Sequence, residues 1–164
     1  MKSSSVSGDA QAHQQPTATA QTQRMAEAGI YQCLVSSASR TRRNMLSKAA
    51  NDAGWDSILC NSPEEVSSNL EHVVLQFALV DLDHRGSTPS GAKDLVHGLI
   101  QRDPHLLVGV CGHEADPSEE IWARQLGVWL YLPGATTSSE MSLLFEQALQ
   151  IVAAQRVTQE ISVT

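Results

Sequence analysis

The 164-residue sequence has no uninterrupted apolar run approaching the roughly 20 residues that cross a membrane. Its N-terminus also lacks the hydrophobic segment of a secretory signal. Positive charge is scarce: 11 Lys and Arg stand against 18 Asp and Glu, and the net charge is −7. Such a chain repels the phosphates of nucleic acid. We therefore expect a soluble cytoplasmic protein that binds neither membranes nor nucleic acid.

Cysteine is scarce as well. Cys33, Cys60 and Cys111 each lie in an apolar run. Their odd number and the absence of paired spacing argue against a disulfide framework and against a zinc site. We expect buried free thiols in a reducing compartment, with no bound metal and no cofactor.

Residues 1–28 contain almost nothing that could form a core. Between Met1 and Thr22, Val6 is the only branched aliphatic residue, and aromatic residues are absent. A segment of this kind cannot bury enough apolar surface to offset the entropy of ordering its backbone. The composition predicts a disordered tail over 1–28, one domain over 29–155 and a C-terminal extension over 156–164.

Within the domain, short apolar runs alternate with amphipathic segments. The predicted strands cover residues 31–35, 56–60, 77–80, 106–111 and 128–132. Helices are predicted between them, and a last one is predicted to be capped by Ser138 and to run on toward Ile161, since no helix breaker intervenes. This alternation predicts a (βα)₅ α/β fold, a doubly wound parallel sheet in a three-layer sandwich with strand order 2-1-3-4-5. Function in such sheets lies at the carboxyl ends of the strands.

Four segments of the domain resemble one protein family. They are Ser39–Arg42, the Ala-Leu-Val-Asp-Leu-Asp run of Ala78–Asp83, Gln101–Leu106, and Gly127–Leu132 with Tyr131 in an aromatic position. Together they resemble the receiver domain of bacterial two-component response regulators, which has a CheY-like, flavodoxin-like fold. The resemblance implies a role in signal transduction and places Asp81 at the phosphoacceptor position.

The remaining positions depart from the family pattern. Receivers bind Mg²⁺ through an acidic pair after strand one, and use a hydroxyl residue after strand four and a lysine after strand five. Here the corresponding residues are Ser36 and Ser37, Cys111, and Gly134. Magnesium prefers carboxylate oxygens, and phosphoryl transfer needs cations to stabilise the developing charge. The resemblance thus implies a degenerate receiver, or pseudo-receiver, that is not an enzyme and signals through protein contacts without efficient phosphorylation.

Two other functions stay open. The chain could be a single-domain response regulator phosphorylated on Asp81 in a phosphorelay. It could also be a flavodoxin-like binder of a small ligand, with Ser36, Ser37 and Ser39 contacting a phosphate, although no glycine-rich phosphate loop follows the first strand. We interpret four histidines of the domain as solvated rather than as metal ligands. These are His84, His97, His105 and His113.

The expected partner is another signalling protein, such as a histidine kinase. Receivers use the face formed by the fourth helix, the fifth strand and the fifth helix to dimerise or to contact output domains. Trp122, Trp129 and Tyr131 fall on these elements. Because tryptophan is enriched at the centres of interfaces, this face is the predicted contact surface, with a homodimer left open. The alternative is that both tryptophans are partly buried core residues.

Overall fold

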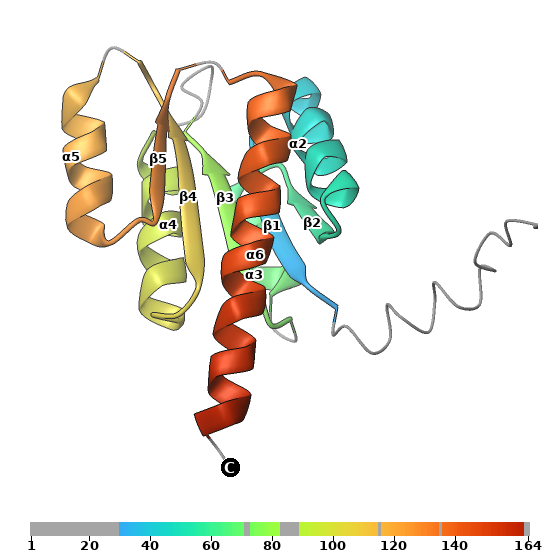
Figure 1. Cartoon of the computed structure of the whole chain (residues 1–164). Coiled ribbons are helices and arrows are strands. Elements are labelled where there is room, and N and C mark those ends of the chain that lie inside the picture. Colours follow the sequence, from blue (N-terminus) through green and yellow to red (C-terminus); the bar gives the residue numbers. More distant parts are fainter. Residues whose placement is uncertain (1–29, 71–72, 83–88, 115, 135, 163–164) are drawn as a thin grey trace, which may run out of the picture. The chain divides into compact units, whose positions relative to one another are not determined.

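A computed structural model describes residues 30–70, 73–82, 89–114, 116–134 and 136–162 (Figure 1). Five parallel strands form one sheet in the order β2-β1-β3-β4-β5. The strands are β1 Gln32–Ser36, β2 Asp56–Cys60, β3 Phe77–Asp81, β4 Leu107–Gly112 and β5 Leu130–Pro133. The helices are α2 Arg40–Asp52, α3 Pro63–Asn69, α4 Pro89–Arg102, α5 Pro117–Leu126 and α6 Ser138–Ser162. The predicted doubly wound fold and strand order are confirmed, whereas the predicted tail over 1–28 lies outside the described residues.

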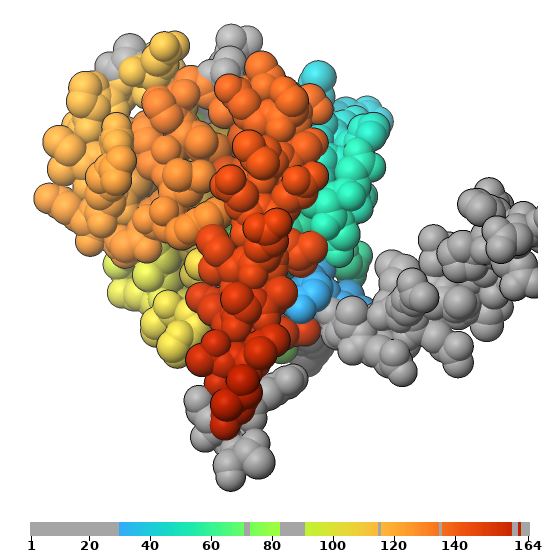
Figure 2. All heavy atoms as spheres, viewed as in Figure 1, coloured from blue at the N-terminus to red at the C-terminus, as the bar shows by residue number. Residues whose placement is uncertain are grey.

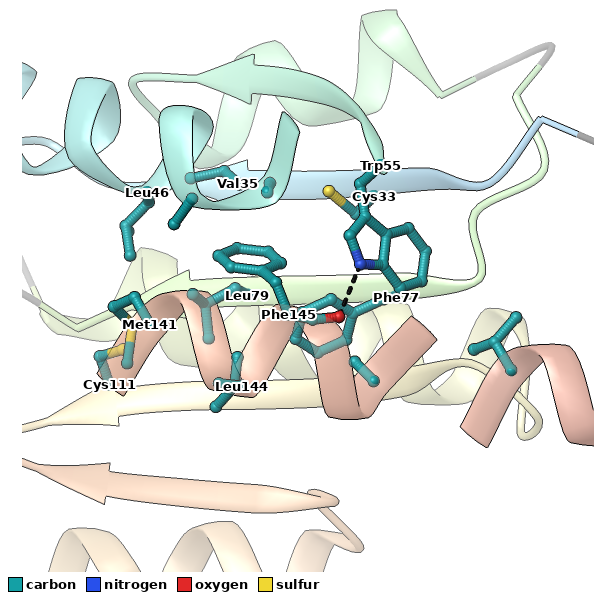
Figure 3. Packing of buried hydrophobic residues seen from close by; sticks show 14 residues of the cluster. Cys33, Val35, Leu46, Trp55, Phe77, Leu79, Cys111, Met141, Leu144 and Phe145 are labelled. Carbon is teal, nitrogen blue, oxygen red and sulfur yellow. Dashed lines mark hydrogen bonds between the residues drawn. The ribbon is translucent and has the colours of Figure 1, made fainter. Parts of the chain in front are cut away.

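Alternate residues of each strand serve opposite faces of the sheet, as the pleat requires. In β3, Phe77 and Leu79 face α2 and α6, while Ala78 and Val80 face α3, α4 and α5. The first face is built around aromatic rings (Figure 3). Phe77 and Phe145 pack edge to face with their centroids 5.6 Å apart, and the Trp55 indole nitrogen donates a 2.9 Å hydrogen bond to the Phe145 carbonyl. This bond satisfies the buried indole and fixes α6 against the turn that precedes β2.

Several predicted boundaries were wrong by one or two residues: β1 and β4 each lie one residue later than predicted, and β3 ends one residue later. β5 begins at Leu130 rather than Val128 because the chain leaves α5 through Gly127 in a left-handed conformation, with φ 89°. The Val128 N–H then bonds the Ala123 carbonyl of the helix and cannot join the sheet. At α6 the cap is Thr137, not Ser138. Its hydroxyl accepts from the Glu140 N–H while the Glu140 carboxylate accepts from the Thr137 N–H, which forms a reciprocal capping box.

The other expectations that concern the interior are confirmed. Cys33, Cys60 and Cys111 are free and buried. Helix α6 continues through Ser162, past Ile161, as the lack of a helix breaker predicted. In the described part of the chain, no helix has both the length and the apolar composition to span a membrane.

Candidate functional site

The carboxyl ends of β1, β3 and β4 converge on Asp81. Asp81 is the last residue of β3 and is paired in register with Cys111 of β4, while Ser36 of β1 is paired with Val80. The hydroxyl of Ser37, just after β1, donates a 2.8 Å hydrogen bond to Asp81 Oδ2. Of the positions that the sequence singled out, Ser37 and Cys111 therefore lie against this carboxylate.

Among the residues described, the cation that pairs with Asp81 comes from a residue that sequence reasoning did not single out. Arg42 Nε, in the first turn of α2, lies 2.8 Å from Asp81 Oδ2. The pair is largely withdrawn from solvent, with side-chain exposures of 18% for Arg42 and 7% for Asp81. The guanidinium also donates to the Thr136 hydroxyl at 3.3 Å. Arg42 thus connects β3 to the segment that follows β5, near Gly134.

The local sequence explains how Arg42 reaches this place. Ser39 caps α2 by accepting from the Arg42 N–H, which starts the helix directly over the edge of the sheet. Arg43, the next residue, donates a 2.6 Å hydrogen bond to the Ser37 carbonyl and holds the β1–α2 turn closed. The first turn of α2 contains no acidic residue. Cations at the positive end of a helix are unfavourable by themselves, so the Asp81 carboxylate offsets this cost.

These residues do not fit a magnesium ion. Ser36 and Ser37, which hold the positions of the acidic pair, are buried but carry no charge, so the end of β1 supplies no carboxylate beside Asp81. The Arg42 guanidinium lies against that same oxygen. Mg²⁺ sites in proteins rely on one or two carboxylates with bound waters, and a fixed cation 2.8 Å from the carboxylate opposes binding.

Cys111 supplies no reactive group to the site. It is 1% exposed, and burial raises the pKa of its thiol to about 11, with Arg42 acting in the opposite direction. A neutral thiol is a weak hydrogen-bond donor and a weak nucleophile. Cys111 therefore fills the position of the expected hydroxyl residue as an apolar side chain.

A second buried polar cluster lies next to this site, between α5 and the ends of β4 and β5. The Tyr131 hydroxyl donates a 3.0 Å hydrogen bond to Glu119 Oε1, which also accepts from the His113 N–H at 2.9 Å. Glu119 is 1% exposed, and Lys93 Nζ lies 3.9 Å from its other oxygen. Burial, and then the bond to Glu119, raise the pKa of Tyr131 far above its ordinary value. Glu119 stands in the first turn of α5, where an acid also suits the helix dipole, so its position alone does not indicate a buried role.

The architecture matches solved receiver domains. A CheY-like response regulator receiver domain protein from Methanospirillum hungatei JF-1 superposes with a TM-score of 0.66 at 12% identity, over 79% of this chain and 99% of that chain. CheY4 of Vibrio cholerae gives 0.61 at 16% identity, over 76% and 99%. The receiver domain of NtrX from Brucella abortus gives 0.63 at 15% identity, over 72% and 98%.

The chain has the receiver fold. No protein-family model matches the sequence, and no curated protein matches it with significance. Identities of this size show a shared fold alone, so the chemistry must be read from the residues of this chain.

Within the receiver fold, Trp122 and Trp129 lie on opposite faces of the sheet near the edge strand β5. The Trp122 ring packs on the α4–α5 side beneath Lys93 Nζ, which is 5.1 Å from its centroid. The Trp129 ring packs on the α6 side, edge to face with Phe77 at 5.8 Å. Both are half-buried, whereas Tyr131 is buried. Tyr131 can therefore support the predicted contact surface from inside the domain but cannot supply much of its contact area.

The histidines that the structure describes do not gather around the site. His97, His105 and His113 are exposed, while His84 lies outside the described residues, as does Asp83. Among the residues described, no three His, Cys, Asp or Glu side chains form a group that could hold a metal ion.

Proposed function

We propose that this domain is a degenerate receiver that works in two-component-type signalling through protein–protein contacts, with Arg42 permanently neutralising the phosphoacceptor position. The observation that carries the proposal is the 2.8 Å ion pair between Arg42 and Asp81. It places a cation of the protein itself on the oxygen that would have to attack a phosphoryl group.

The energetics support this reading. Removing one partner of a buried ion pair costs about 3–5 kcal/mol, so separating Asp81 from Arg42 is expensive. Ser37 adds a hydrogen bond to the same oxygen. Neither a metal-binding acidic pair nor a lysine after β5 compensates for that cost by stabilising a phosphoryl group.

The surface that we propose for contact with a partner is also held in one conformation. Tyr131 is kept inside by its bond to Glu119, and Glu119 is part of α5. The contact surface that we propose, called the α5–β5–α6 face, includes the half-buried Trp122 and Trp129 and the 57% exposed Ile121. A histidine kinase or another signalling protein would recognise this single form.

Phosphorylation decides between the proposal and the open alternative. Acetyl phosphate or beryllofluoride with Mg²⁺ should change neither the intact mass nor the two-dimensional NMR spectrum of the wild-type domain. A receiver with a complete acidic pair and lysine serves as the positive control. Arg42→Ala frees Asp81 but restores no metal ligand, so it should also stay unmodified. A stoichiometric phosphoryl gain at Asp81 in the wild type would make the chain a working single-domain response regulator.

The proposed face is tested by substitutions that spare the core. Trp122→Ala should weaken the complex with the cognate partner by about 2 kcal/mol or more if Trp122 is a hot spot. Ile121→Glu should do the same, and the exposed Gln125 on the same helix provides a Gln125→Ala control. Isothermal titration calorimetry measures the affinities. Unchanged binding by both variants, with intact circular dichroism spectra, would place the contact elsewhere.

A further inference from the structure

Helices α3 and α4 lie close together at their first turns and diverge along their length. A Cβ atom on Gly91, near the start of α4, would lie 3.4 Å from Pro63 Cγ of α3. A Cβ atom on Gly98, about two turns further along α4, would meet none of the described residues within 4 Å beyond its own helix. The space that opens between the helices is a groove of about 480 Å³, a volume typical of ligand-binding pockets. We call it the α3–α4 groove.

The floor of the groove is apolar. It is formed by Val66, by Leu70 at the end of α3, and by Leu95 and Leu99 of α4. Val66, Leu70 and Leu99 are at most 3% exposed, so they are packed into the core and give the groove a firm base. At the far end, the Arg102 guanidinium donates a 2.8 Å hydrogen bond to the Leu70 carbonyl and ties α4 to the C-terminal end of α3. The groove is therefore a preformed feature of the domain.

The α3–α4 groove is separate from the α5–β5–α6 face. Its described lining residues belong to α3, to α4 and to the C-cap Leu70, and none of them belongs to α5, β5 or α6. Helices α3 and α4 cover the face of the sheet opposite to α2 and α6 (Figure 1). Figure 2 views the molecule from the side of α6, where α2, α5 and α6 form most of the surface. A ligand in the groove would therefore not compete with a partner on the α5–β5–α6 face.

The charged side chains of the groove follow an order along its length. Glu64 of α3 and Asp94 of α4, both exposed, lie near the end where the two helices meet. Arg102 lies at the other end and is the only cation among the described residues that line the groove. The helical rise from Gly91 to Arg102 is about 16 Å, or three turns. A complementary ligand is thus apolar in its middle, positive over the two acids and negative over Arg102.

We propose that the α3–α4 groove binds an amphipathic helix of a partner protein, with basic residues in its first turn over Glu64 and Asp94. A helix of about three turns matches the length of the groove, and its apolar side chains at positions i, i+3, i+4 and i+7 form one side of it. In this orientation its positive end faces the two acids and its last unpaired carbonyls face Arg102. A second copy of this chain carries a net charge of −7, which opposes its approach to these acids. This second contact is independent of the proposed function.

Two synthetic peptides of the same composition test the charge and the orientation of the occupant. Each is an alanine-rich helix of roughly 15 residues with blocked ends and leucines at positions i, i+3, i+4 and i+7. One carries lysines in its first turn and glutamates in its last, and the other has these residues exchanged. By isothermal titration calorimetry, the full chain should bind the lysine-first peptide about fivefold or more tightly than the exchanged one.

The exchanged peptide is the more stable helix in isolation because its charges suit the helix dipole, so helicity alone cannot produce the expected preference. Addition of the lysine-first peptide should shift amide signals of α3 and α4 in the two-dimensional NMR spectrum of the full chain. Equal affinities, no saturable binding of either peptide, or shifts centred on the α5–β5–α6 face would overturn the proposal.

Variants of α4 show whether the peptide occupies the groove. Gly98→Leu fills the open space and should weaken binding of the lysine-first peptide tenfold or more. Leucine is also a better helix former than glycine, so this variant should melt at a higher temperature than the wild type, which excludes unfolding as the cause. His97→Leu places the same side chain at an exposed neighbouring position outside the groove and should change the affinity less than twofold. Equal effects of the two variants would contradict binding in the groove.

Two further measurements test the charge pattern and the identity of the occupant. Asp94→Lys should reduce the preference between the two peptides to less than twofold, and an unchanged preference would remove the electrostatic basis of the proposal. In sedimentation equilibrium without peptide, Gly98→Leu should behave as the wild type does. A wild-type dimer that Gly98→Leu abolishes would assign the groove to a second copy of the chain instead of a partner helix.

Discussion

At the scale of single residues, Arg42 changes the interpretation of the site more than any absent residue does. The missing acids and lysine could be inferred from the sequence, since they follow from position along the strands. The ion pair to Asp81 could not, because it depends on the direction of a long side chain. One signal was present. Helices α3, α5 and α6 begin with glutamates, whereas α2 carries Arg40, Arg42 and Arg43 in its first turn. That reversal against the helix dipole indicates a nearby carboxylate.

Gly112 offers a test of the second buried cluster. A Cβ atom there would overlap with the Tyr131 hydroxyl oxygen and with Glu119 Oε1. Gly112→Ala should therefore push Tyr131 off Glu119 and lower the free energy of unfolding by about 1–3 kcal/mol. Urea unfolding followed by Trp fluorescence measures this change.

A matched control for Gly112 is available in α4. Gly98 is exposed, and a Cβ atom there would meet no atom within 4 Å. Gly98→Ala should raise the free energy of unfolding by about 0.5–1 kcal/mol through helix propensity alone. If Gly112→Ala behaved like Gly98→Ala, the Tyr131–Glu119 contact would not be tightly packed.

At the scale of elements, the sequence predicted the type and order of every strand and helix, but it placed several of their boundaries one or two residues away from where they lie. The hydrophobic period identifies a buried face but leaves open which of several hydroxyl residues accepts the first N–H groups. Thr137, Ser138 and Ser139 all precede the apolar face of α6. Only the three-residue spacing from Thr137 to Glu140 forms the reciprocal bonds.

The cap predicts a difference between neighbouring hydroxyl residues. Thr137→Ala removes an acceptor for the Glu140 N–H and should lower the free energy of unfolding by about 1 kcal/mol. Ser138→Ala, one residue later, should change it by less than about 0.5 kcal/mol because the Ser138 side chain is exposed. Thermal and urea unfolding of the two variants decide the matter. Equal losses would show that the two hydroxyls share the cap.

At the scale of the whole molecule, buried thiol and phenol groups predict that the domain loses stability at alkaline pH. Burial raises the thiol pKa of Cys33, Cys60 and Cys111, and the pKa of Tyr131 is raised as well. Each folded group keeps its proton to a higher pH than its unfolded counterpart. Their contribution is therefore complete below pH 9, the ordinary thiol value, and is lost as the pH rises above it.

The contribution of Cys111 to this loss of stability can be measured separately. Between pH 9 and about 11 it should contribute a slope of at most about 1.4 kcal/mol per pH unit. Urea unfolding under reducing conditions at several pH values measures the slope. Cys111→Ala should lower stability at neutral pH through a cavity, yet flatten the profile above pH 9. Parallel profiles for the variant and the wild type would mean that the thiol titrates normally.

The Arg42–Asp81 pair also bears on how much information the domain can carry. A protein that switches between a modified and an unmodified form can report a stimulus while its amount stays constant. A protein whose site holds its own counter-ion has one chemical state, so under the proposed function it conveys a signal only through how many copies are made and where they are placed. Its output would then follow the synthesis and degradation of the protein rather than a modification of copies already present.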